Sequence, residues 1–573
     1  MNEKTVRAAI SVLFASLVIA LFYTQLVRFN FYSRLSKNNV IRIIPIDGPR
    51  GTFFDRRGVP LVRDRLAFDV AVVYQELRDR THFMQTLKDV LGIQDEKIRK
   101  ALSKASAKPY APVTVIEDIG KDKAMVLEEA STDISGLVIE TRSRRHYIYN
   151  DSGSHIFGYL SEVTEEELEG LRDYGYRPKD LVGRSGLEKR YDRYLTGLDG
   201  GMQIQVDNKG RQRKVLGVKE PSAGKDIYLT VDIAIQETVD RLLGDRNGAV
   251  VVMDPRNGEV LALASHPAFD PNVFVRPDGS DERVRLLMDR KGRPLSDRAI
   301  SALYAPGSVF KIVIASAALN SGKITPNTTF VCNGSYALGR SKFDCWKETG
   351  HGPQMVVEGL KNSCNVFFYS TGRLIGADII EAYAKAFGFG RPTGIDLPDE
   401  VGGLVPGKLW KRLARNENWY EGETLNYSIG QGFLLVTPIQ VMQMTAVIAN
   451  GGKIVRPYLV KQIDSSVVAD VRSKNIGLRS DTIRKVREGM REVVSSADGT
   501  GRRSGVEGVV VAGKTGTAQN PQGRTHAWFT GFAPYDDPRV CLVVFLEHGG
   551  KGGLEPAEIA GGIFEVAKER GYI

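Results

Sequence analysis

The N-terminal run from Ala8 to Val27 contains twenty consecutive residues without a charge. That is about the length an α-helix needs to cross the apolar core of a bilayer, so the run predicts a membrane-spanning helix. A cleaved signal peptide is the alternative. The run is long for a signal peptide, and no small-x-small cleavage site follows it before Arg28. We therefore expect residues 1–30 to form a short cytoplasmic tail and an uncleaved transmembrane anchor.

Positive charges beside this run do not decide its orientation. Lys4 and Arg7 precede it, and Arg28, Arg34 and Lys37 follow it. The charge rule places the more basic side of a span in the cytoplasm, and here both sides are basic. The side of the membrane on which the rest of the chain lies has to be inferred from its chemistry.

The remaining sequence is that of a folded protein with a basic surface. Its 573 residues, 42% apolar and 25% charged, are enough for two or three domains with buried cores. The net charge of +10 suits an anionic membrane surface, an acidic polymer or nucleic acid. The sequence contains neither an arginine-rich arm nor the mixture of aromatic and basic residues typical of RNA-binding sheets. We expect no nucleic-acid partner.

A polar, glycine-containing segment at residues 218–226 predicts a boundary between two domains. The preceding part of the chain is irregular and charged, with short extended and helical pieces. One helical piece opens with Thr164, followed three residues later by Glu167, which is the pattern of a capping box. We expect a first domain over residues 38–225 and a second over residues 226–573.

The second domain is predicted to be α+β. Two apolar runs within residues 248–265 flank an Asn-Gly pair, which is a strong hairpin signal. Two more strands are expected at 525–534 and 539–549, followed by a closing helix. Strands at both ends of the domain and a largely helical middle predict a sheet that joins the two ends.

A serine and a lysine stand three residues apart at the start of a predicted helix. A Pro-Gly turn leads into an apolar run, so that Ser308 and Lys311 share one face of the first turn. A serine becomes nucleophilic when a base removes its proton, and a lysine is such a base only when its pKa is lowered. A helix N-terminus disfavours the ammonium and offers N–H groups to an oxyanion. The pattern alone is weak evidence, because Ser222 and Lys225 fit it as well.

Two further polar motifs follow. A Ser-Cys-Asn motif occupies residues 363–365, and a Lys-Thr-Gly-Thr motif at residues 514–517 lies on a predicted strand. Taken singly, the first fits a polar turn and the second a solvated edge strand. Their order is more informative, because Ser-x-x-Lys, Ser-x-Asn and Lys-Thr-Gly in succession are typical of serine β-lactamases and penicillin-binding proteins.

Beyond these motifs the chain resembles the class B penicillin-binding proteins over almost its whole length. Residues 49–62 and 183–197 resemble two signatures of the N-terminal pedestal domain of that class, and residues 426–452 resemble a landmark of its transpeptidase domain. Residues 343–352 and 526–534 are similar to the elongation-type members. The resemblance implies an elongated pedestal (dimerisation-like) domain and a serine β-lactamase/transpeptidase-like domain with an antiparallel sheet and a helical subdomain.

The resemblance also implies a serine-type D-Ala-D-Ala transpeptidase that crosslinks peptidoglycan stem peptides during cell elongation. Lys311 would take the proton of Ser308, which attacks the penultimate D-alanine. Ser363 would relay a proton to the leaving D-alanine, and Asn365 would orient Lys311. The N–H groups of Ser308 and Thr517 would form the oxyanion hole. Lys514, Thr515 and Thr517 would hold the terminal carboxylate by charge and hydroxyl contact, and Gly516 is implied as a further substrate-binding residue.

The same resemblance implies that catalysis needs no cofactor and that a β-lactam acylates Ser308 and stays bound. It implies a single-pass protein of the inner membrane whose catalytic domain lies outside the cytoplasm, in the periplasm. The partners it implies are stem peptides, β-lactams, the membrane, a SEDS-family glycan polymerase (RodA) and MreC.

Other functions share some of these features. A serine β-lactamase has the motifs but is a shorter soluble chain, and a membrane β-lactam sensor needs more than one transmembrane span. A division-type transpeptidase is a further alternative. A non-catalytic scaffold that activates a glycan polymerase belongs to a different class of function. The intact motif residues argue against a pseudoenzyme, although a scaffold role is compatible with catalysis.

Three of the four cysteines fall in one region with a histidine: Cys332, Cys345, His351 and Cys364. In an oxidising compartment one interpretation is a Cys332–Cys345 disulfide that leaves Cys364 free. The other is a Cys3His site, which matches a structural zinc in ligand type and number. Elongation-type class B proteins resemble this pattern, and we favour zinc over the disulfide. The outer residues of Ser-x-Asn face the active site, so Cys364 is expected to point away from it. Cys541 lies apart in an apolar strand and is interpreted as a small buried hydrophobe.

Overall fold

The computed structural model describes residues 2–33, 41–171, 176–206, 212–520 and 523–573. The chain forms two compact units, each built from three segments of the sequence. The first unit comprises Met1–Gly51, Asp64–Arg144 and Thr196–Gly224. The second unit comprises Thr52–Arg63, Arg145–Leu195 and Lys225–Ile573.

The charge-free N-terminal run is helical, as expected. Helix α1 (Glu3–Phe22) continues into a π-helical turn at Tyr23–Val27, and neither contains a buried residue. Among the described residues, Glu3–Val27 is the one helix long and apolar enough to cross a membrane. It fits a single-pass membrane anchor, because its apolar side chains need a non-aqueous environment that the protein itself does not supply.

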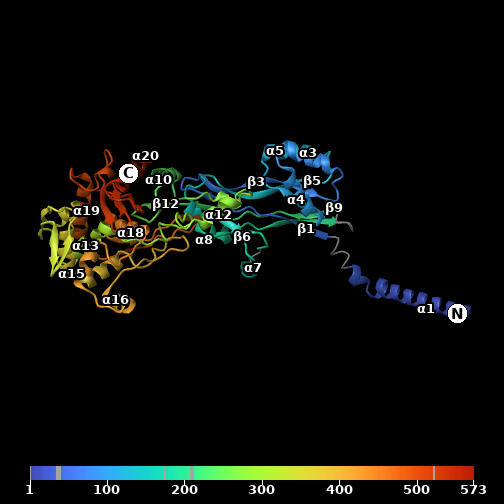
Figure 1. Cartoon of the computed structure of the whole chain (residues 1–573), viewed down its shortest axis with the longest axis horizontal. Coiled ribbons are helices and arrows are strands. Elements are labelled where there is room, and N and C mark those ends of the chain that lie inside the picture. Colours follow the sequence, from blue (N-terminus) through green and yellow to red (C-terminus); the bar gives the residue numbers. More distant parts are fainter. Residues whose placement is uncertain (1, 34–40, 172–175, 207–211, 521–522) are drawn as a thin grey trace. The chain divides into compact units, whose positions relative to one another are not determined.

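The rest of the first unit contains two β structures (Figure 1). One is an antiparallel sheet in the order β1-β8-β9. In the other, β3 (Pro60–Val73) pairs antiparallel with β4 along residues 70–73 and also pairs with β5. The remaining elements of this unit are β1 (Ile41–Ile46), α3 (Arg80–Leu91), α4 (Asp95–Ser106), β4 (Pro112–Ile116), α5 (Lys121–Ala130), β5 (Leu137–Tyr147), β8 (Gly200–Val206) and β9 (Gln212–Lys219).

Apolar side chains of β3 and of the three helices form the core of this unit. Val70 and Val72 of β3 lie in one cluster with Phe83, Ile98 and Leu127, one from each of α3, α4 and α5. Local signals fix the helix ends, as α3 illustrates. Asp79 accepts hydrogen bonds from two backbone N–H groups of its first turn, and Gly92 ends it in the left-handed region at φ 72°.

The second unit is organised around a five-stranded antiparallel sheet in the order β12-β11-β23-β22-β21. β11 (Gly248–Met253) and β12 (Val260–His266) form the expected hairpin. β11 also pairs with β23 (Val540–Leu546), so the sheet joins the two ends of the domain as the sequence predicts. The Lys-Thr-Gly-Thr motif lies on β21 (Ala512–Ala518), which pairs with β22 (His526–Ala533).

Helices cover both faces of this sheet. α10 (Ile233–Leu243) and α20 (Glu555–Glu569) pack on one face and on each other (Figure 1). α18 (Pro438–Ala449) packs on β11, β22 and β23 from the other side and is completely buried. A capping box starts α18, because the side chain of Thr437 accepts from the N–H of Gln440 and the side chain of Gln440 accepts from the N–H of Thr437.

The helical subdomain packs beside the sheet at β21. Its helices α13, α14, α15, α17 and α19 contact one another, and α19 also contacts β21. α15 is interrupted at Gly376, whose φ of 77° is not helical. The bounds of these helices are α13 (Lys311–Asn320), α14 (Val356–Lys361), α15 (Asn365–Ala386), α17 (Glu421–Ser428) and α19 (Ser480–Ser495).

Short elements complete the second unit. The predicted capping box at Thr164 and Glu167 is present at the start of α7.

Ser222 and Lys225, the second Ser-x-x-Lys pair, lie outside any helix. The short elements are β2 (Phe53–Phe54), α6 (Ser154–Phe157), β6 (Leu160–Glu162), α7 (Glu165–Leu171), β7 (Leu181–Gly183), α8 (Gly186–Arg190), α9 (Asp192–Leu195), β10 (Ile227–Leu229), α11 (Asn272–Val275), α12 (Ser280–Met288), the 3-10 helix η3 (Gly307–Phe310), β13 (Phe330–Cys332), β14 (Ser335–Leu338), β15 (Ser341–Asp344), β16 (Gly352–Gln354), α16 (Lys408–Arg415), β17 (Lys453–Val455), β18 (Val460–Ile463), β19 (Ser466–Val467), β20 (Ser473–Asn475) and the 3-10 helix η4 (Arg502–Ser504).

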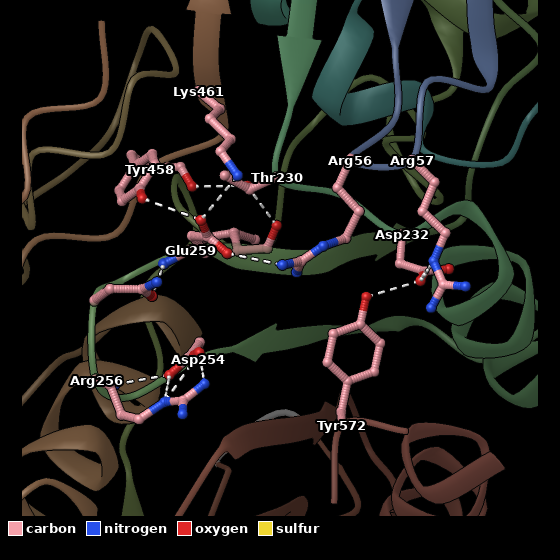
Figure 2. Close-up of polar contacts among 12 residues, drawn as sticks. Arg56, Arg57, Thr230, Asp232, Asp254, Arg256, Glu259, Tyr458, Lys461 and Tyr572 are labelled. Carbon is pink, nitrogen blue, oxygen red and sulfur yellow. Dashed lines mark hydrogen bonds and ion pairs between the residues drawn. The ribbon is translucent and has the colours of Figure 1, made fainter. Parts of the chain in front are cut away.

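A polar cluster fastens the segment 52–63 to the body of the second unit (Figure 2). The carboxylate of Asp232 is fully buried and caps the N-terminus of α10. Arg57 of the segment lies 3.2 Å from this carboxylate, and Arg570 and Tyr572 near the chain end donate to it at 3.2 Å and 2.8 Å. The neighbouring Arg56 of the same segment donates to Glu259 at 3.0 Å. Asp232 therefore connects three distant parts of the sequence.

We expect Asp232→Asn to destabilise the second unit by about 2 kcal/mol, because it removes the charge that two guanidinium groups and a helix N-terminus share. Trypsin should then cleave after Arg56 or Arg57 faster than in the wild-type protein, and the melting temperature should fall. The matched control is Asp281→Asn, which removes the same charge from the exposed first turn of α12. Equal cleavage rates in the two variants would contradict this role of Asp232.

Candidate active site

Ser308 lies on the 3-10 turn η3, directly before α13, rather than on the α-helix itself. Gly307 brings this turn against strand β21. Its φ is +57°, and an added Cβ would lie 2.7 Å from the backbone oxygen of Thr517. The backbone of Ser308 therefore starts beside that of Thr517. Ser308 is half-buried, and within the described part of the chain its hydroxyl makes no hydrogen bond.

Lys311 is the first residue of α13 and is fully buried. Its Nζ donates to the backbone oxygen of Ser363 at 2.8 Å, to the Oδ1 of Asn365 at 2.7 Å and to the Oγ of Ser363 at 3.3 Å. Burial lowers the pKa of Lys311 to about 8, while the thiols of Cys364 and Cys345 act in the opposite direction. The helix terminus was expected to contribute to this lowering, but burial is the main cause.

A second buried lysine approaches the same serine. Lys514 of β21 donates to the Oγ of Ser363 at 2.9 Å and to the backbone oxygen of Thr515 at 2.9 Å. Burial and the neighbouring charge of Lys311 both lower the pKa of Lys514 well below its usual value. Ser363 thus lies between two amines that cannot both remain charged at low cost.

The backbone of Ser363 is strained. Its φ of 48° lies in the left-handed region, which costs a residue with a Cβ about 1–3 kcal/mol and is found preferentially at functional sites. Ser363 follows α14, and Asn365 is the first residue of α15, so the motif is held at the junction of two helices. The Nδ2 of Asn365 donates to the backbone oxygen of Asp344, which leaves its Oδ1 directed at Lys311.

Thr500 was not identified from the sequence. The hydroxyl of Thr515 donates to the hydroxyl of Thr500 at 3.0 Å, and Thr500 donates to the backbone oxygen of Lys361 at 3.3 Å. Lys361 also pairs with Asp498 at 3.0 Å. The loop 498–501 is therefore fixed to both β21 and the segment before Ser363. The only signal in the sequence is the Gly-Thr-Gly at 499–501, which is a weak signal for a functional residue.

Glu547 is a second residue near the site that was not identified from the sequence. Its carboxylate accepts from the hydroxyl of Tyr304 at 2.5 Å and from the Nε of Arg298 at 3.1 Å, and Arg298 is almost fully buried. Burial alone would raise the pKa of Glu547, but these two donors outweigh it and lower the pKa. Because Tyr304 precedes Ser308 by four residues, these contacts hold the chain that leads into the turn carrying Ser308.

The three cysteines and the histidine that the sequence singled out lie together. One ligand atom from each of Cys332, Cys345, His351 and Cys364 lies within 4.8 Å of the others, and the cysteines are not disulfide-bonded. The Nδ1 of His351 is 3.5 Å and 3.6 Å from the sulfurs of Cys332 and Cys345. Ligands bound to zinc at 2.0–2.3 Å in a tetrahedron lie about 3.5–3.8 Å apart, so these two distances match tetrahedral edges.

The protonation of His351 suits a bound cation. Burial lowers the pKa of His351, so the imidazole is neutral and able to bind a metal. A hydrogen bond between the two thiols lowers the pKa of Cys345 to about 4 and raises that of Cys364. The sulfur of Cys364 also caps α15 by accepting from the N–H of Phe367 at 3.4 Å. The neighbours of Cys364 in the motif, Ser363 and Asn365, are the residues that contact Lys311.

Family comparisons identify both parts of the chain. Residues 248–565 match the penicillin binding protein transpeptidase domain, and residues 45–229 match the penicillin-binding protein dimerisation domain. The peptidoglycan D,D-transpeptidase MrdA of Salmonella typhimurium (strain SL1344) is 32% identical over 96% of this chain and 92% of its own. The chain belongs to the elongation-type class B penicillin-binding proteins. It is a peptidoglycan D,D-transpeptidase of the serine acyl-transfer type.

Solved structures agree with this assignment. The penicillin-binding protein PBP2 of Helicobacter pylori, in its complex with MreC, superposes with a TM-score of 0.78 and 29% identity over 93% of this chain and all of its own. A chain of a solved peptidoglycan synthase complex that coordinates polymerization and crosslinking gives a TM-score of 0.78 and 31% identity over 98% of both chains. The α+β fold with its transpeptidase and dimerisation domains, predicted from the sequence, is confirmed.

Proposed function

We propose that Ser308 is the nucleophile of this transpeptidase and that Lys311 is its general base. The contact that carries the proposal is the one between Lys311 and the Ser363–Asn365 motif, which holds the amine fully buried at the start of the helix that follows Ser308. Burial lowers the pKa of Lys311, so that a substantial fraction of the amine is neutral near physiological pH, and only a neutral amine accepts a proton. The acyl-enzyme forms when the Oγ of Ser308 attacks the penultimate D-alanine carbonyl and the terminal D-alanine leaves.

The remaining motif residues have supporting roles in this proposal. Ser363, hydrogen-bonded to both lysines, passes the proton to the departing amine of D-alanine. The N–H groups of Ser308 and Thr517 bind the developing oxyanion. Lys514, Thr515 and Thr517 bind the terminal carboxylate. Gly516 lets this strand pack closely on its neighbours, because a Cβ there would lie 3.0 Å from the side chains of Val309 and Trp528.

We expect Ser308→Ala to abolish covalent labelling by penicillin while the melting temperature stays unchanged. Lys311→Ala should reduce the labelling rate by at least about 100-fold, because the base is missing. Intact-protein mass spectrometry after incubation with penicillin measures both effects. Ser222→Ala and Lys225→Ala, in the second Ser-x-x-Lys pair, are the matched controls and should label normally. A covalent adduct on the Ser308→Ala protein would refute the assignment of the nucleophile.

The lowered pKa of Lys311 also predicts a pH dependence. The fraction of neutral amine rises about tenfold per unit of pH below its pKa of about 8 and levels off above it. The second-order rate constant of penicillin acylation should therefore increase from pH 6.5 to about 8 and then reach a plateau. Melting temperatures measured at each pH show whether the protein stays folded over this range. A rate constant that does not change between pH 6.5 and 9 would exclude Lys311 as the base.

We further propose that Cys332, Cys345, His351 and Cys364 bind a structural zinc ion. Their spacing, the neutral histidine and the absence of disulfides among the described cysteines support zinc over a disulfide. Four protein ligands leave no open coordination position, so the ion takes no part in the reaction. Its effect is to hold the rear of the Ser363–Asn365 motif, through Cys364, against the segment that carries the other three ligands.

We expect the purified protein to contain one zinc per chain. Cys345→Ser should lose the metal, lower the melting temperature and slow penicillin acylation at Ser308, because Ser363 and Asn365 are then less well positioned. Cys541→Ala is the matched control, since this thiol is buried in β23 beside Met442 and is not one of the four clustered ligands, and it should keep the metal. Elemental analysis and thiol counting after denaturation decide the question. A metal-free protein with two of the three cysteines oxidised would refute the proposal.

We propose the domain division that the sequence predicted: an anchor in residues 1–30, a pedestal in 38–225 and the transpeptidase domain in 226–573, which lies on the periplasmic side of the inner membrane. The relatives solved with MreC and within a peptidoglycan synthase complex support a polymerase of the RodA type and MreC as partners. Protease added to intact spheroplasts should digest residues 226–573, and protection of these residues would refute the orientation.

If the pedestal binds the polymerase, exposed apolar residues on it should contribute to the contact. Met125 and Val126 on α5 are 62% and 51% exposed, which is unusual for two adjacent apolar side chains. We expect Met125→Gln with Val126→Gln to reduce the stimulation of the polymerase and leave penicillin labelling unchanged. Val284→Gln, 56% exposed on α12, is the matched control. A polymerase that is equally active with and without this protein would refute the partnership.

A further inference from the structure

A hollow of about 440 Å³ opens beside the Lys-Thr-Gly-Thr strand and has no role in the mechanism described above. It lies at the loop between α19 and η4 and is floored by the segment that precedes α20. Its lining residues are Gly499, Thr500, Arg502, Arg503 and Gly553.

This hollow is joined to the active site by side-chain contacts. Thr500, in its wall, accepts the hydrogen bond of Thr515 and donates to the backbone of Lys361, two residues before Ser363. On the other side a Cβ on Gly553 would lie 3.8 Å from the methyl group of Thr515 and only 2.3 Å from the backbone oxygen of Thr500. The glycine therefore keeps the space open between the loop and the strand.

The charge of the hollow favours an anion. Arg502 is exposed, and no carboxylate pairs with it in the described part of the chain. Arg503 pairs with Glu558 at 3.1 Å, and the one acidic group of the loop, Asp498, is occupied by Lys361 at 3.0 Å. A free guanidinium beside a pocket binds carboxylates well, because its planar fork can form two parallel hydrogen bonds.

The order of the reaction indicates which substrate occupies this space. If Thr515 binds the terminal carboxylate of the donor peptide, as proposed above, the donor chain ends there and has no atoms to place in the hollow. The second substrate, the acceptor, attacks the acyl carbon from the side that the leaving D-alanine vacated. It must therefore occupy the site at Thr515 and extend beyond it, towards Thr500 and Arg502.

We propose that the hollow is the acceptor subsite and that Arg502 binds a free carboxylate of the acceptor stem peptide. The inference rests on the assignment of Ser308 and of the carboxylate site made above. In the step it serves, the neutral amine of the acceptor forms a C–N bond to the acyl carbon and the ester bond to the Oγ of Ser308 breaks. The proton that the amine loses passes to this Oγ. Arg502 acts on the binding of the acceptor and has no part in forming the acyl-enzyme.

Two acceptors of different length distinguish acceptor binding by Arg502 from a role in the carboxylate site at Thr515. The full-length protein in detergent is acylated with a thioester donor that mimics acyl-D-alanine. It is then resolved either by D-serine, whose one carboxylate reaches only the Thr515 site, or by a stem tetrapeptide with a free side-chain amine. The variants are Arg502→Gln and Arg502→Lys. Arg484→Gln, on the exposed side of α19, is the matched control.

We expect Arg502→Gln to raise the KM for the tetrapeptide about tenfold, through the loss of a charge-assisted hydrogen-bond pair. The KM for D-serine and the rate of penicillin acylation should stay within about twofold of the wild-type values. All three quantities should stay within about twofold in Arg484→Gln. Arg502→Lys should recover part of the tetrapeptide affinity because it keeps the charge without the fork.

An unchanged KM for the tetrapeptide in Arg502→Gln, together with normal penicillin acylation, would overturn the acceptor subsite and leave the assignment of Ser308 intact. A parallel loss of affinity for D-serine would also overturn it, because Arg502 would then serve the carboxylate site that the donor uses. Absence of penicillin acylation in the wild-type protein would instead refute the function proposed for Ser308, on which the subsite depends.

Discussion

The buried amine of Lys311 is the interaction on which the catalytic architecture depends. It has three acceptors within hydrogen-bond distance, all from Ser363 and Asn365, and no access to water. An amine in this position is tolerated because each of its protons has a partner, and it is useful because burial brings its pKa to about 8. The same contacts tie α13 to the junction of α14 and α15, so the chemistry and the packing of the helical subdomain cannot be separated.

Lys514 extends this arrangement to the sheet. It reaches Ser363 from β21, so a single hydroxyl connects the two lysines and, through them, the helical subdomain and the edge strand. Two amines so close in a buried site repel each other when both are protonated, which favours the loss of one proton. The strained backbone of Ser363 has a physical explanation in this setting, because the left-handed φ directs both its carbonyl and its hydroxyl at Lys311.

Further polar contacts around Lys311 and Ser363 hold the site in place. The ion pair of Glu547 with Arg298 and the hydroxyl of Tyr304 hold the approach to Ser308, and Cys364 faces a cluster of three other possible metal ligands. The loop containing Thr500 connects strand β21 with the segment before Ser363. Each of these features holds a residue of the candidate site in place, and each joins separate segments of the sequence.

The sequence by itself determined the elements and the order of the motifs. The length of the apolar run predicted α1, the two apolar runs flanking Asn257-Gly258 predicted the β11–β12 hairpin, and the pair Thr164 and Glu167 predicted the start of α7, because these signals act over a few residues. Tertiary structure alone decided that Lys311 is buried, that Thr500 meets Thr515 and that Glu547 neutralises Arg298. Those outcomes depend on contacts between residues tens to hundreds of positions apart, and the energy of burying a charge appears only once its surroundings are assembled. No local pattern in a single sequence encodes them.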